Sequence, residues 1–181
     1  LITDKINYIN KNSINTISNS YNIDAIVTAT GFNAGKMIWP IEVLGKNGTN
    51  LNDYWEDDNP RAHIGITVPN FPNFFMMYGP NTNLAHGGSI VFQGECQIRY
   101  ILGCINLLLE KNYNNMDCKI ESYIKYNTKL DEQHAQMVWT HNKVDSWYRN
   151  KVGRVTTNSP WRLVDYWNFT KEPKESDYIF N

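Results

Sequence analysis

Residues 71–101 read FPNFFMMYGPNTNLAHGGSIVFQGECQIRYI, and the interpretation of the whole chain starts from this stretch. Residues 74–78 are apolar and aromatic without a break, which is typical of a strand buried on both faces. Gly79 and Pro80 should end that strand, because a proline cannot donate to a sheet ladder. A glycine-rich turn over residues 84–89 then leads directly into a predicted helix.

The helix that begins at Ile90 is predicted from the spacing of its apolar residues. They recur at the intervals of one helical face, at Val91, Ile98, Ile101, Leu102, Ile105, Leu108 and Leu109. The first N–H groups of a helix lack internal partners, and the helix dipole places partial positive charge there. A strand, a glycine-rich turn and a helix N-terminus together therefore predict a place that holds negative charge.

Composition limits the classes of function that the chain can have. Its 181 residues are enough for one or two domains, and a hydrophobic content of 41% allows a substantial core. The net charge of −1 gives no indication of binding to nucleic acid or to an anionic membrane. The most apolar run, residues 100–109, is far shorter than the roughly 20 residues that span a bilayer.

The cysteines and histidines indicate neither a disulfide framework nor a metal site. Cys96, Cys104 and Cys118 are odd in number and lack CxxC spacing, so we expect reduced thiols in a cytoplasmic protein. His134 and His141 lie seven residues apart, and no carboxylate or cysteine falls at ligand spacing from them. No metal site is therefore predicted.

The rest of the chain shows short elements separated by turns. Apolar runs bounded by polar residues predict strands, at residues 1–9, 14–17, 23–29, 63–68 and 119–124. A polar turn is expected at residues 18–22. Further helices are predicted over residues 51–55, from a cap at Asn127 or Thr128 to about Trp139, and over residues 161–170. The polar end, residues 171–181, is expected to lie over the surface.

Four segments of the chain match one enzyme family in that family's order. They are IDAIVTATGF (residues 23–32), IEVLGKNGTNLNDYW (41–55), HIGITVPNFPNFFMMYGPNT (63–82) and SWYRNKVGR (146–154). Together they resemble the C-terminal part of a Baeyer–Villiger monooxygenase. The tail NSPWRLVDYW, residues 158–167, is most similar to the 4-hydroxyacetophenone monooxygenase branch.

This resemblance implies an α/β fold taken from a flavoprotein with two dinucleotide-binding domains. Residues 1–31 would close the NADPH-binding domain, and residues 32–181 would form the C-terminal half of the FAD-binding domain. The parent enzyme would use FAD, NADPH and molecular oxygen to convert ketones to esters or lactones through a flavin C4a-peroxide. Its GxGxxG motifs and catalytic arginine should lie upstream of Leu1, so we expect an inactive fragment whose partner is the missing N-terminal half.

The resemblance also implies which residues contact the flavin. The turn and the helix N-terminus would face the pyrimidine edge of the flavin ring, through Gly79, Asn81, His86, Gly87, Gly88, Ser89 and Ile90. Gly87 and Gly88 would let the backbone approach the ring without a Cβ in the way. Taken without the family, the same turn could simply connect a strand to a helix.

Two further sites are implied on other segments. Thr30 and Gly31 would pass close to both nucleotides, although a strand that ends at a glycine is the commoner explanation of such a pair. Trp147 would contact the NADP ribose through its indole N–H, whereas most tryptophans pack in a core. The aromatic group at Trp161, Tyr166 and Trp167 is better explained by core packing than by substrate contact.

Two alternatives to this function stay open. A flavin monooxygenase that oxygenates nitrogen or sulfur would use the same turn and helix. A non-catalytic remnant or interaction domain would explain why the sequence contains no pyrophosphate-binding motif.

Overall fold

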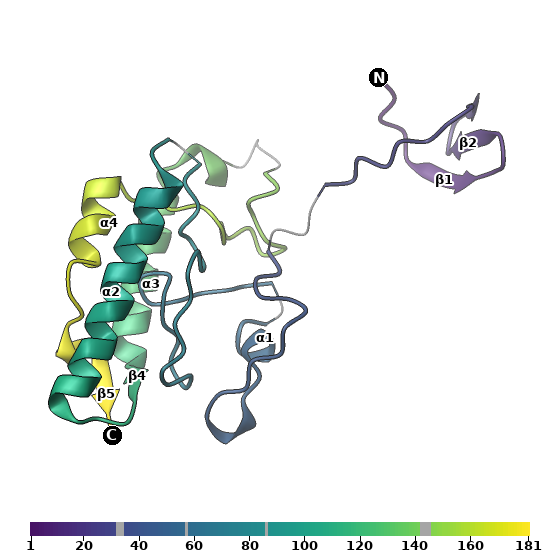
Figure 1. The fold of residues 1–181 in the computed structure, drawn as a ribbon. Coiled ribbons are helices and arrows are strands. Elements are labelled where there is room, and N and C mark those ends of the chain that lie inside the picture. The colour runs from purple at the N-terminus through teal and green to yellow at the C-terminus, as the bar shows by residue number, and fades with distance from the viewer. Residues whose placement is uncertain (32–34, 57, 86, 142–145) are drawn as a thin grey trace. The chain divides into compact units, whose positions relative to one another are not determined.

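The computed structural model describes residues 1–31, 35–56, 58–85, 87–141 and 146–181 (Figure 1). The chain divides into two compact units, Leu1–Phe32 and Asn33–Asn181. The first unit is a small antiparallel sheet, and the second combines helices with a short strand pair. The predicted α/β class is therefore confirmed.

The first unit is a meander of short strands. β1 (Ile6–Ile9), β2 (Ser13–Thr16) and β3 (Ser20–Asn22) pair antiparallel in the order β1-β2-β3. β1 and β2 fall within or close to the predicted strands, whereas β3 forms where a polar turn was expected. Ile6 is 51% exposed and Tyr8 54%, so this sheet buries little apolar surface by itself.

Residues 23–29 do not form the predicted strand, although the structure describes all of them. The N–H of Ile23 donates to the carbonyl of Asn12 at 2.9 Å, and the chain then leaves the sheet. Val27 is 89% exposed. A β-rich sequence becomes a strand only beside another strand that pairs with its backbone, and the apolar pattern alone does not supply one.

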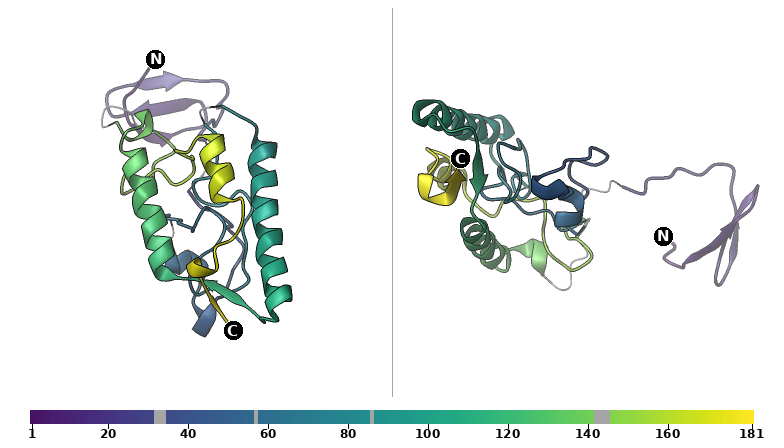
Figure 2. Two further views of the ribbon diagram at one scale, coloured as in Figure 1. Left: turned by 90° about the vertical axis from the view of Figure 1, so that its left-hand side faces the viewer. Right: turned by 90° about the horizontal axis from the view of Figure 1, so that it is seen from below.

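The second unit packs helices around a pair of strands. Its helices are α1 (Leu51–Tyr54), α2 (Ile90–Lys111), α3 (Ile120–His134) and α4 (Leu163–Phe169), with 3-10 turns η1 (Lys46–Gly48), η2 (Val138–Thr140) and η3 (Glu175–Asp177). β4 (Met116–Cys118) pairs antiparallel with β5 (Tyr178–Phe180). Figure 2 shows α2 and α3 at two margins of this unit, with α4 between them.

The main core lies between these helices and the strand pair. Its most buried side chains include Ile66, Tyr100, Cys104, Met116, Leu130, Tyr166 and Tyr178. The hydroxyls of Tyr100 and Tyr178 hydrogen-bond to each other at 2.7 Å, which satisfies two polar ends inside the core. A second cluster beside α1 consists of Leu51, Trp55, Ala62, Val68, Phe71 and Met76. The three cysteines are free, as predicted, and all of them are buried.

α2 confirms the helix predicted from Ile90, but its buried face is not its apolar face. Ser89 caps the helix, since its Oγ accepts the N–H of Phe92 at 3.3 Å. The buried side chains are Gln93, Cys96, Gln97, Tyr100 and Cys104. The exposed apolar side chains are Ile90, Val91, Ile98, Leu102, Ile105 and Leu109. An amphipathic helix normally turns its apolar side to the core, and α2 presents most of that side to solvent instead.

Residues 74–78 do not form the predicted strand, although all five are described. The N–H of Met76 donates to the carbonyl of Ile66 at 2.9 Å, and that of Tyr78 donates to the Gln97 side chain at 2.9 Å. Tyr78 has a φ of 55°, which no extended strand adopts. Phe74 and Met76 pack in the cluster beside α1 and Phe75 packs against the main core, and this requires no sheet.

Residues 119–124, predicted as a strand, lie at the start of α3, which also ends earlier than predicted. The buried residues of α3 recur at helical spacing, at Tyr123, Asn127, Leu130 and His134. Asn127 is therefore not a cap. Its amide donates to the carbonyls of Ala62 at 3.2 Å and Tyr123 at 2.9 Å. A polar residue on the core side hid the helical period of this segment.

Of the remaining predictions, those for two segments are wrong and those for two short helices are confirmed. Residues 63–68 form a tight turn rather than a strand, since the N–H of His63 donates to the carbonyl of Thr67 at 2.7 Å. Residues 171–181 include η3 and β5 instead of lying over the surface, and Tyr178 is only 2% exposed. The short helices α1 and α4 agree with prediction, and Trp161 packs in the core as expected.

A buried arginine joins the irregular segments of the second unit. Arg154 donates from Nε to Asp131 on α3 at 2.8 Å and from Nη1 to the carbonyl of Pro60 at 3.0 Å. Its Nη2 donates to Oδ1 of Asn81 at 3.2 Å. Asp131 also accepts from Arg61 at 2.9 Å. The Arg154 side chain is 8% exposed, so one guanidinium joins three separate segments within the interior.

Replacing this guanidinium should destabilise the chain far more than replacing an exposed one. We expect Arg154→Met to lower the free energy of unfolding by roughly 2–4 kcal/mol, since Asn81 and partly buried Asp131 lose a partner. Arg162→Met is the matched control: Arg162 pairs with Asp165 at 2.7 Å but is 79% exposed. Its loss should cost less than about 1 kcal/mol. Urea unfolding measures both, and equal losses would contradict the role given to Arg154.

Candidate functional site

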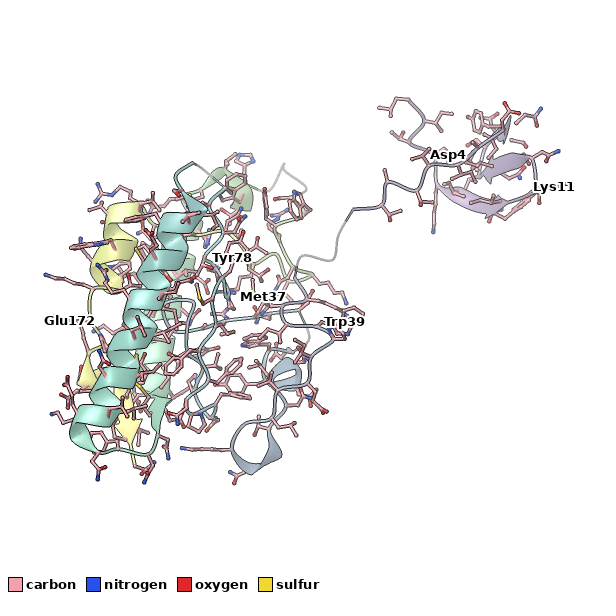
Figure 3. All side chains as sticks on the ribbon, viewed as in Figure 1. Asp4, Lys11, Met37, Trp39, Tyr78 and Glu172 are labelled. Atoms are coloured by element: carbon pink, nitrogen blue, oxygen red, sulfur yellow. The ribbon has the colours of Figure 1, made fainter. Side chains whose placement is uncertain are left out.

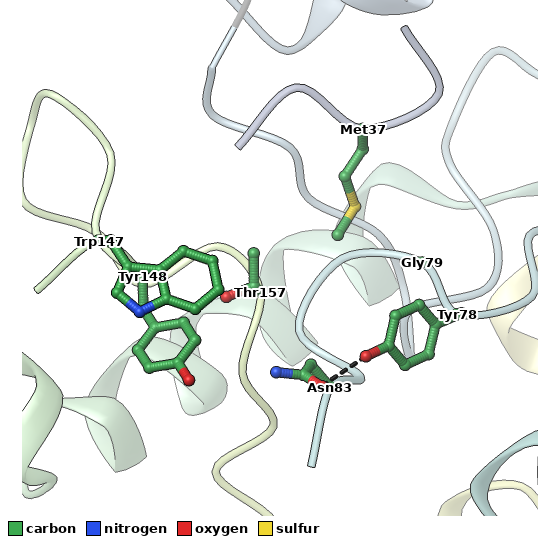
Figure 4. A pocket seen from close by; sticks show the side chains of 7 residues that line it. All are labelled: Met37, Tyr78, Gly79, Asn83, Trp147, Tyr148 and Thr157. Atoms are coloured by element: carbon green, nitrogen blue, oxygen red, sulfur yellow. Dashed lines mark hydrogen bonds between the residues drawn. The ribbon is translucent and has the colours of Figure 1, made fainter. Parts of the chain in front are cut away.

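The candidate site is a pocket between the turn at residues 78–83 and the segment that carries Trp147 (Figure 4). Its cavity measures about 180 Å³, which suits one ring or another small group rather than a whole dinucleotide. The lining residues are Met37, Tyr78, Gly79, Asn83, Trp147, Tyr148 and Thr157. Gly79 and Trp147, both predicted as site residues, therefore lie on the same pocket, and Figure 3 labels two further lining residues, Met37 and Tyr78.

Trp147 forms an exposed aromatic wall of this pocket. Its ring lies 4.3 Å from that of Tyr148, measured between centroids, with 32° between the planes. Tyr148 meets Trp139 edge-on at 5.2 Å, which holds it against η2. Trp147 is 63% exposed, so it does not pack in the core. It offers a ligand a flat π surface and the N–H donor of an indole.

Tyr78 and Asn83 form a polar pair on the other side of the pocket. The Tyr78 hydroxyl donates to Oδ1 of Asn83 (Figure 4). Nδ2 of Asn83 donates in turn to Oδ1 of Asn158 at 2.9 Å. Partial burial, and then the nearby Tyr148, raise the pKa of Tyr78. Its hydroxyl is therefore a protonated hydrogen-bonding group at neutral pH.

A buried relay fixes the backbone of Tyr78. Oε1 of Gln97 on α2 accepts the Tyr78 N–H at 2.9 Å, and Nε2 of Gln97 donates to the Tyr166 hydroxyl at 3.1 Å. That hydroxyl donates to the carbonyl of Ile64 at 2.9 Å. All three side-chain bonds are at least partly buried, so α2 and α4 together set where the pocket begins.

Gly79 and Asn81 support the turn from within the protein. A Cβ on Gly79 would lie 2.3 Å from the carbonyl oxygen of Gly65, so close backbone packing requires glycine there. Asn81 is 1% exposed, and its amide donates to the carbonyls of Val155 at 2.8 Å and Asn158 at 3.2 Å. Asn81 therefore positions the turn and does not present its side chain at the surface.

The glycines before α2 differ in their surroundings. Gly87 has a φ of 107°, and a Cβ there would meet nothing within 4 Å. Gly88 has a φ of 111°, and its Cβ would lie 2.7 Å from the Leu163 side chain. Gly87 therefore faces open space beside the helix N-terminus, whereas Gly88 packs against α4. This open backbone, followed by the capping Ser89 and by Ile90, fits the anionic edge of a planar cofactor.

Three predicted site residues do not belong to the described part of the second unit. His86 lies outside the described residues. Thr30 and Gly31 belong to the first unit and are exposed, and Gly31 has a φ of 81° that favours glycine.

Several pocket residues were not predicted from the sequence, namely Met37, Tyr78, Asn83, Tyr148 and Thr157. Tyr78 was interpreted as part of a buried strand. Asn83 and Thr157 come from distant segments of the chain, and the N–H of Asn83 donates to the carbonyl of Thr157 at 3.0 Å. The adjacency of Tyr148 to Trp147 was the one available signal. Among the described residues, no cluster of His, Cys, Asp or Glu could hold a metal ion, and no helix has the length and apolarity to cross a bilayer.

His134 does not line the pocket but supports it through Asn158. Its Nε2–H donates to the carbonyl of Asn158 at 2.9 Å, and the residue is 3% exposed. Burial lowers the pKa of His134 to about 4, because the charged imidazolium would lose its solvation. His134 is therefore neutral in the folded protein at physiological pH.

The low pKa of His134 predicts an acid-dependent loss of stability. The unfolded chain binds this proton near pH 6.5 and the folded chain only near pH 4, so stability should fall as pH decreases through that window. The full effect is bounded at about 3 kcal/mol. Unfolding free energies at several pH values should show a steeper slope for wild type than for His134→Gln. Parallel slopes would contradict the assignment.

Comparisons with known proteins identify homologues of the chain. No family model matches it. It is 44% identical over 159 residues to the uncharacterized monooxygenase y4iD of Sinorhizobium fredii, covering 88% of this chain and 24% of that protein. It is 34% identical over 183 residues to the FAD-binding monooxygenase ktnD of Aspergillus niger, covering 99% and 30%. A Baeyer-Villiger monooxygenase of Pseudomonas aeruginosa is 36% identical over 145 residues, covering 78% and 27%.

Solved structures share the fold. The oxidized steroid monooxygenase bound to NADP superimposes with a TM-score of 0.76 at 23% identity, covering 97% of this chain and 33% of that one. A complex of OTEMO with FAD and NADP gives 0.79 at 19% identity, with 97% and 33% covered. The fold is that of the C-terminal portion of flavin monooxygenases. More particularly, the chain is a homologue of FAD-binding and Baeyer–Villiger monooxygenases, and it spans 24% to 30% of the length of the three curated relatives above.

Proposed function

We propose that this chain is the C-terminal portion of an FAD- and NADPH-dependent Baeyer–Villiger monooxygenase. The observation that carries the proposal is the pocket in which the turn before α2 meets the exposed Trp147. In this proposal residues 1–31 belong to the NADPH-binding domain and residues 32–181 to the FAD-binding domain. The N-terminal part of the enzyme is then the partner of this chain.

The residues before α2 fit the flavin of such an enzyme. FAD, when bound, supplies the redox chemistry that couples NADPH and molecular oxygen. The open backbone at Gly87 and the positive end of α2 would hold the negative edge of its ring. The other residues proposed to contact the flavin are His86, Gly88, Ser89 and Ile90. Gly79 and Asn81 fix the turn that precedes them.

The aromatic side of the pocket fits NADP. Trp147 would stack on or hydrogen-bond to the ribose, with Tyr148 behind it fixing the plane of the ring. Tyr78 and Asn83 would orient a polar group of the ligand across the cavity and help exclude water from it. Thr30 and Gly31 are proposed to contact both nucleotides.

The relatives support the proposed substrate class, and the resemblance of the tail is the basis of the proposed branch. We propose a ketone and molecular oxygen as co-substrates, with an ester or lactone as product. The 4-hydroxyacetophenone branch is proposed on residues 158–167 alone, which include the buried Trp161 and Tyr166 and therefore bear mainly on packing. The free, buried thiols support a cytoplasmic location within this proposal.

A chimera tests the function. This chain would replace the matched segment of the Pseudomonas aeruginosa monooxygenase, which covers 27% of that protein. We expect the chimera to retain FAD absorbance and to oxidise NADPH with formation of an ester from a ketone. The unaltered enzyme is the control. A chimera that melts cooperatively but holds no flavin would contradict the proposal, and oxygenation of amines or sulfides alone would favour the nitrogen- or sulfur-oxygenating alternative.

Within that chimera, Trp147→Ala should weaken NADPH binding without destabilising the fold. Loss of one hydrogen bond, worth about 0.5–1.5 kcal/mol, predicts a KM for NADPH raised by a few-fold to about tenfold. The melting temperature should stay nearly constant, because Trp147 is 63% exposed. Trp39→Ala is the matched control, since Trp39 is 65% exposed and does not line the pocket. The assignment fails if both variants leave the KM unchanged.

A further inference from the structure

A second cavity lies at the C-terminal end of α3, and its lining shares no residue with the pocket of the candidate site. It measures about 400 Å³, which is large enough for a small organic molecule. We call it the Arg61 cavity. Its walls include the side chains of Arg61, Asp131, His134, Thr140, Val152 and Arg154.

The charged side chains on the Arg61 cavity sum to a net positive charge. Both oxygens of Asp131 accept from guanidinium groups, Oδ1 from Arg154 at 2.8 Å and Oδ2 from Arg61 at 2.9 Å. Two cations therefore face one carboxylate. The C-terminal end of α3 adds only about half a negative charge. The cavity is therefore better suited to an anion than to a cation.

Arg61 is the cation that a ligand can reach. Its side chain is 30% exposed, whereas that of Arg154 is 8% exposed and uses all three of its nitrogens on protein acceptors. In the part of the chain that the structure describes, only one of the five N–H groups of Arg61 has a partner. A guanidinium with unpaired N–H groups binds an oxyanion through two parallel hydrogen bonds.

His134 adds a hydrogen-bond acceptor that lacks a donor. Because its Nε2–H donates to the carbonyl of Asn158, the other ring nitrogen, Nδ1, carries a lone pair. Nδ1 is buried and has no hydrogen-bond partner among the described residues. A buried acceptor without a partner is destabilising, so a ligand that donates an O–H to it gains affinity.

Valine side chains form an apolar part of the same cavity. Val152 is 78% exposed, and Val155 beneath the surface is 1% exposed. Thr140 turns its hydroxyl hydrogen away from a ligand, since it donates to the carbonyl of His134 at 2.8 Å. The valines therefore offer contact to a hydrocarbon group rather than to a further polar one.

We propose that the Arg61 cavity binds a small hydroxycarboxylic acid. The carboxylate would pair with Arg61, the hydroxyl would donate to Nδ1 of His134, and the hydrocarbon group would contact Val152. Inorganic phosphate shares the oxyanion chemistry but has no group for the valines. The proposed site is separate from the proposed function, because none of its lining residues lines the pocket of the candidate site.

Titration calorimetry of the full 181-residue chain tests the ligand class. Mandelate, which carries a carboxylate, a hydroxyl and a phenyl group, should bind at one site with a Kd on the order of 0.1–1 mM. Phenylacetate lacks only the hydroxyl and should bind about tenfold more weakly, because His134 then gains no donor. Inorganic phosphate should also bind at least about tenfold more weakly, because it leaves the valines uncovered.

Two variants test the location. Arg61→Lys keeps the charge beside Asp131 but removes the planar fork, and Val152→Trp fills the cavity from its exposed side. Each should weaken mandelate binding at least about tenfold. Val164→Trp on α4 is the matched control, since Val164 is 54% exposed and does not line the cavity, and it should leave the Kd unchanged.

Three results would overturn the proposal. One is the absence of saturable heat with mandelate from a chain whose circular dichroism shows its helices. Another is mandelate binding that both Arg61→Lys and Val152→Trp leave unchanged, because the ligand would then lie elsewhere. The third is inorganic phosphate or phenylacetate binding as tightly as mandelate, because the cavity would then not select a hydroxycarboxylic acid.

Discussion

The second unit depends on the buried guanidinium of Arg154. Its regular sheet, in the described part of the chain, is one pair of short strands, and long irregular segments must be held by other means. A planar group with five N–H donors can serve several segments at once. Arg154 bonds Asp131 on α3, the carbonyl of Pro60 and the Asn81 side chain. The turn that leads to α2 is therefore fixed to α3 through one side chain.

That constraint explains why buried hydrogen bonds hold one side of the candidate site in place while its other side is exposed to solvent. Asn81 and His134 both bond the carbonyl of Asn158, and Gln97 holds the backbone of Tyr78. Above this layer, Trp147 and Gly87 face open space. Under the proposed function this division suits a planar cofactor, because the buried polar groups would set the position of the walls while the exposed groups would contact the ligand.

The two sides of α2 differ in burial and in chemistry. The side packed within the unit carries Gln93, Gln97 and Tyr100 as well as two thiols, and much of its bonding is polar. The other side carries the exposed apolar side chains of Val91, Ile98, Leu102, Ile105 and Leu109.

The sequence by itself determined the elements that local chemistry specifies. The helix begins at Ile90 as predicted, because helical spacing acts within a few residues, and Ser89 caps it. Family resemblance assigned Gly79 to a flavin site and Trp147 to a separate NADP site, and only the structure shows that both line one pocket. Only the tertiary structure decided which side of α2 is buried, why residues 74–78 are apolar without forming a strand, and that Asn127 lies in the core. Each of these depends on a partner distant in the chain, and a pattern of apolar residues records burial without recording what buries it.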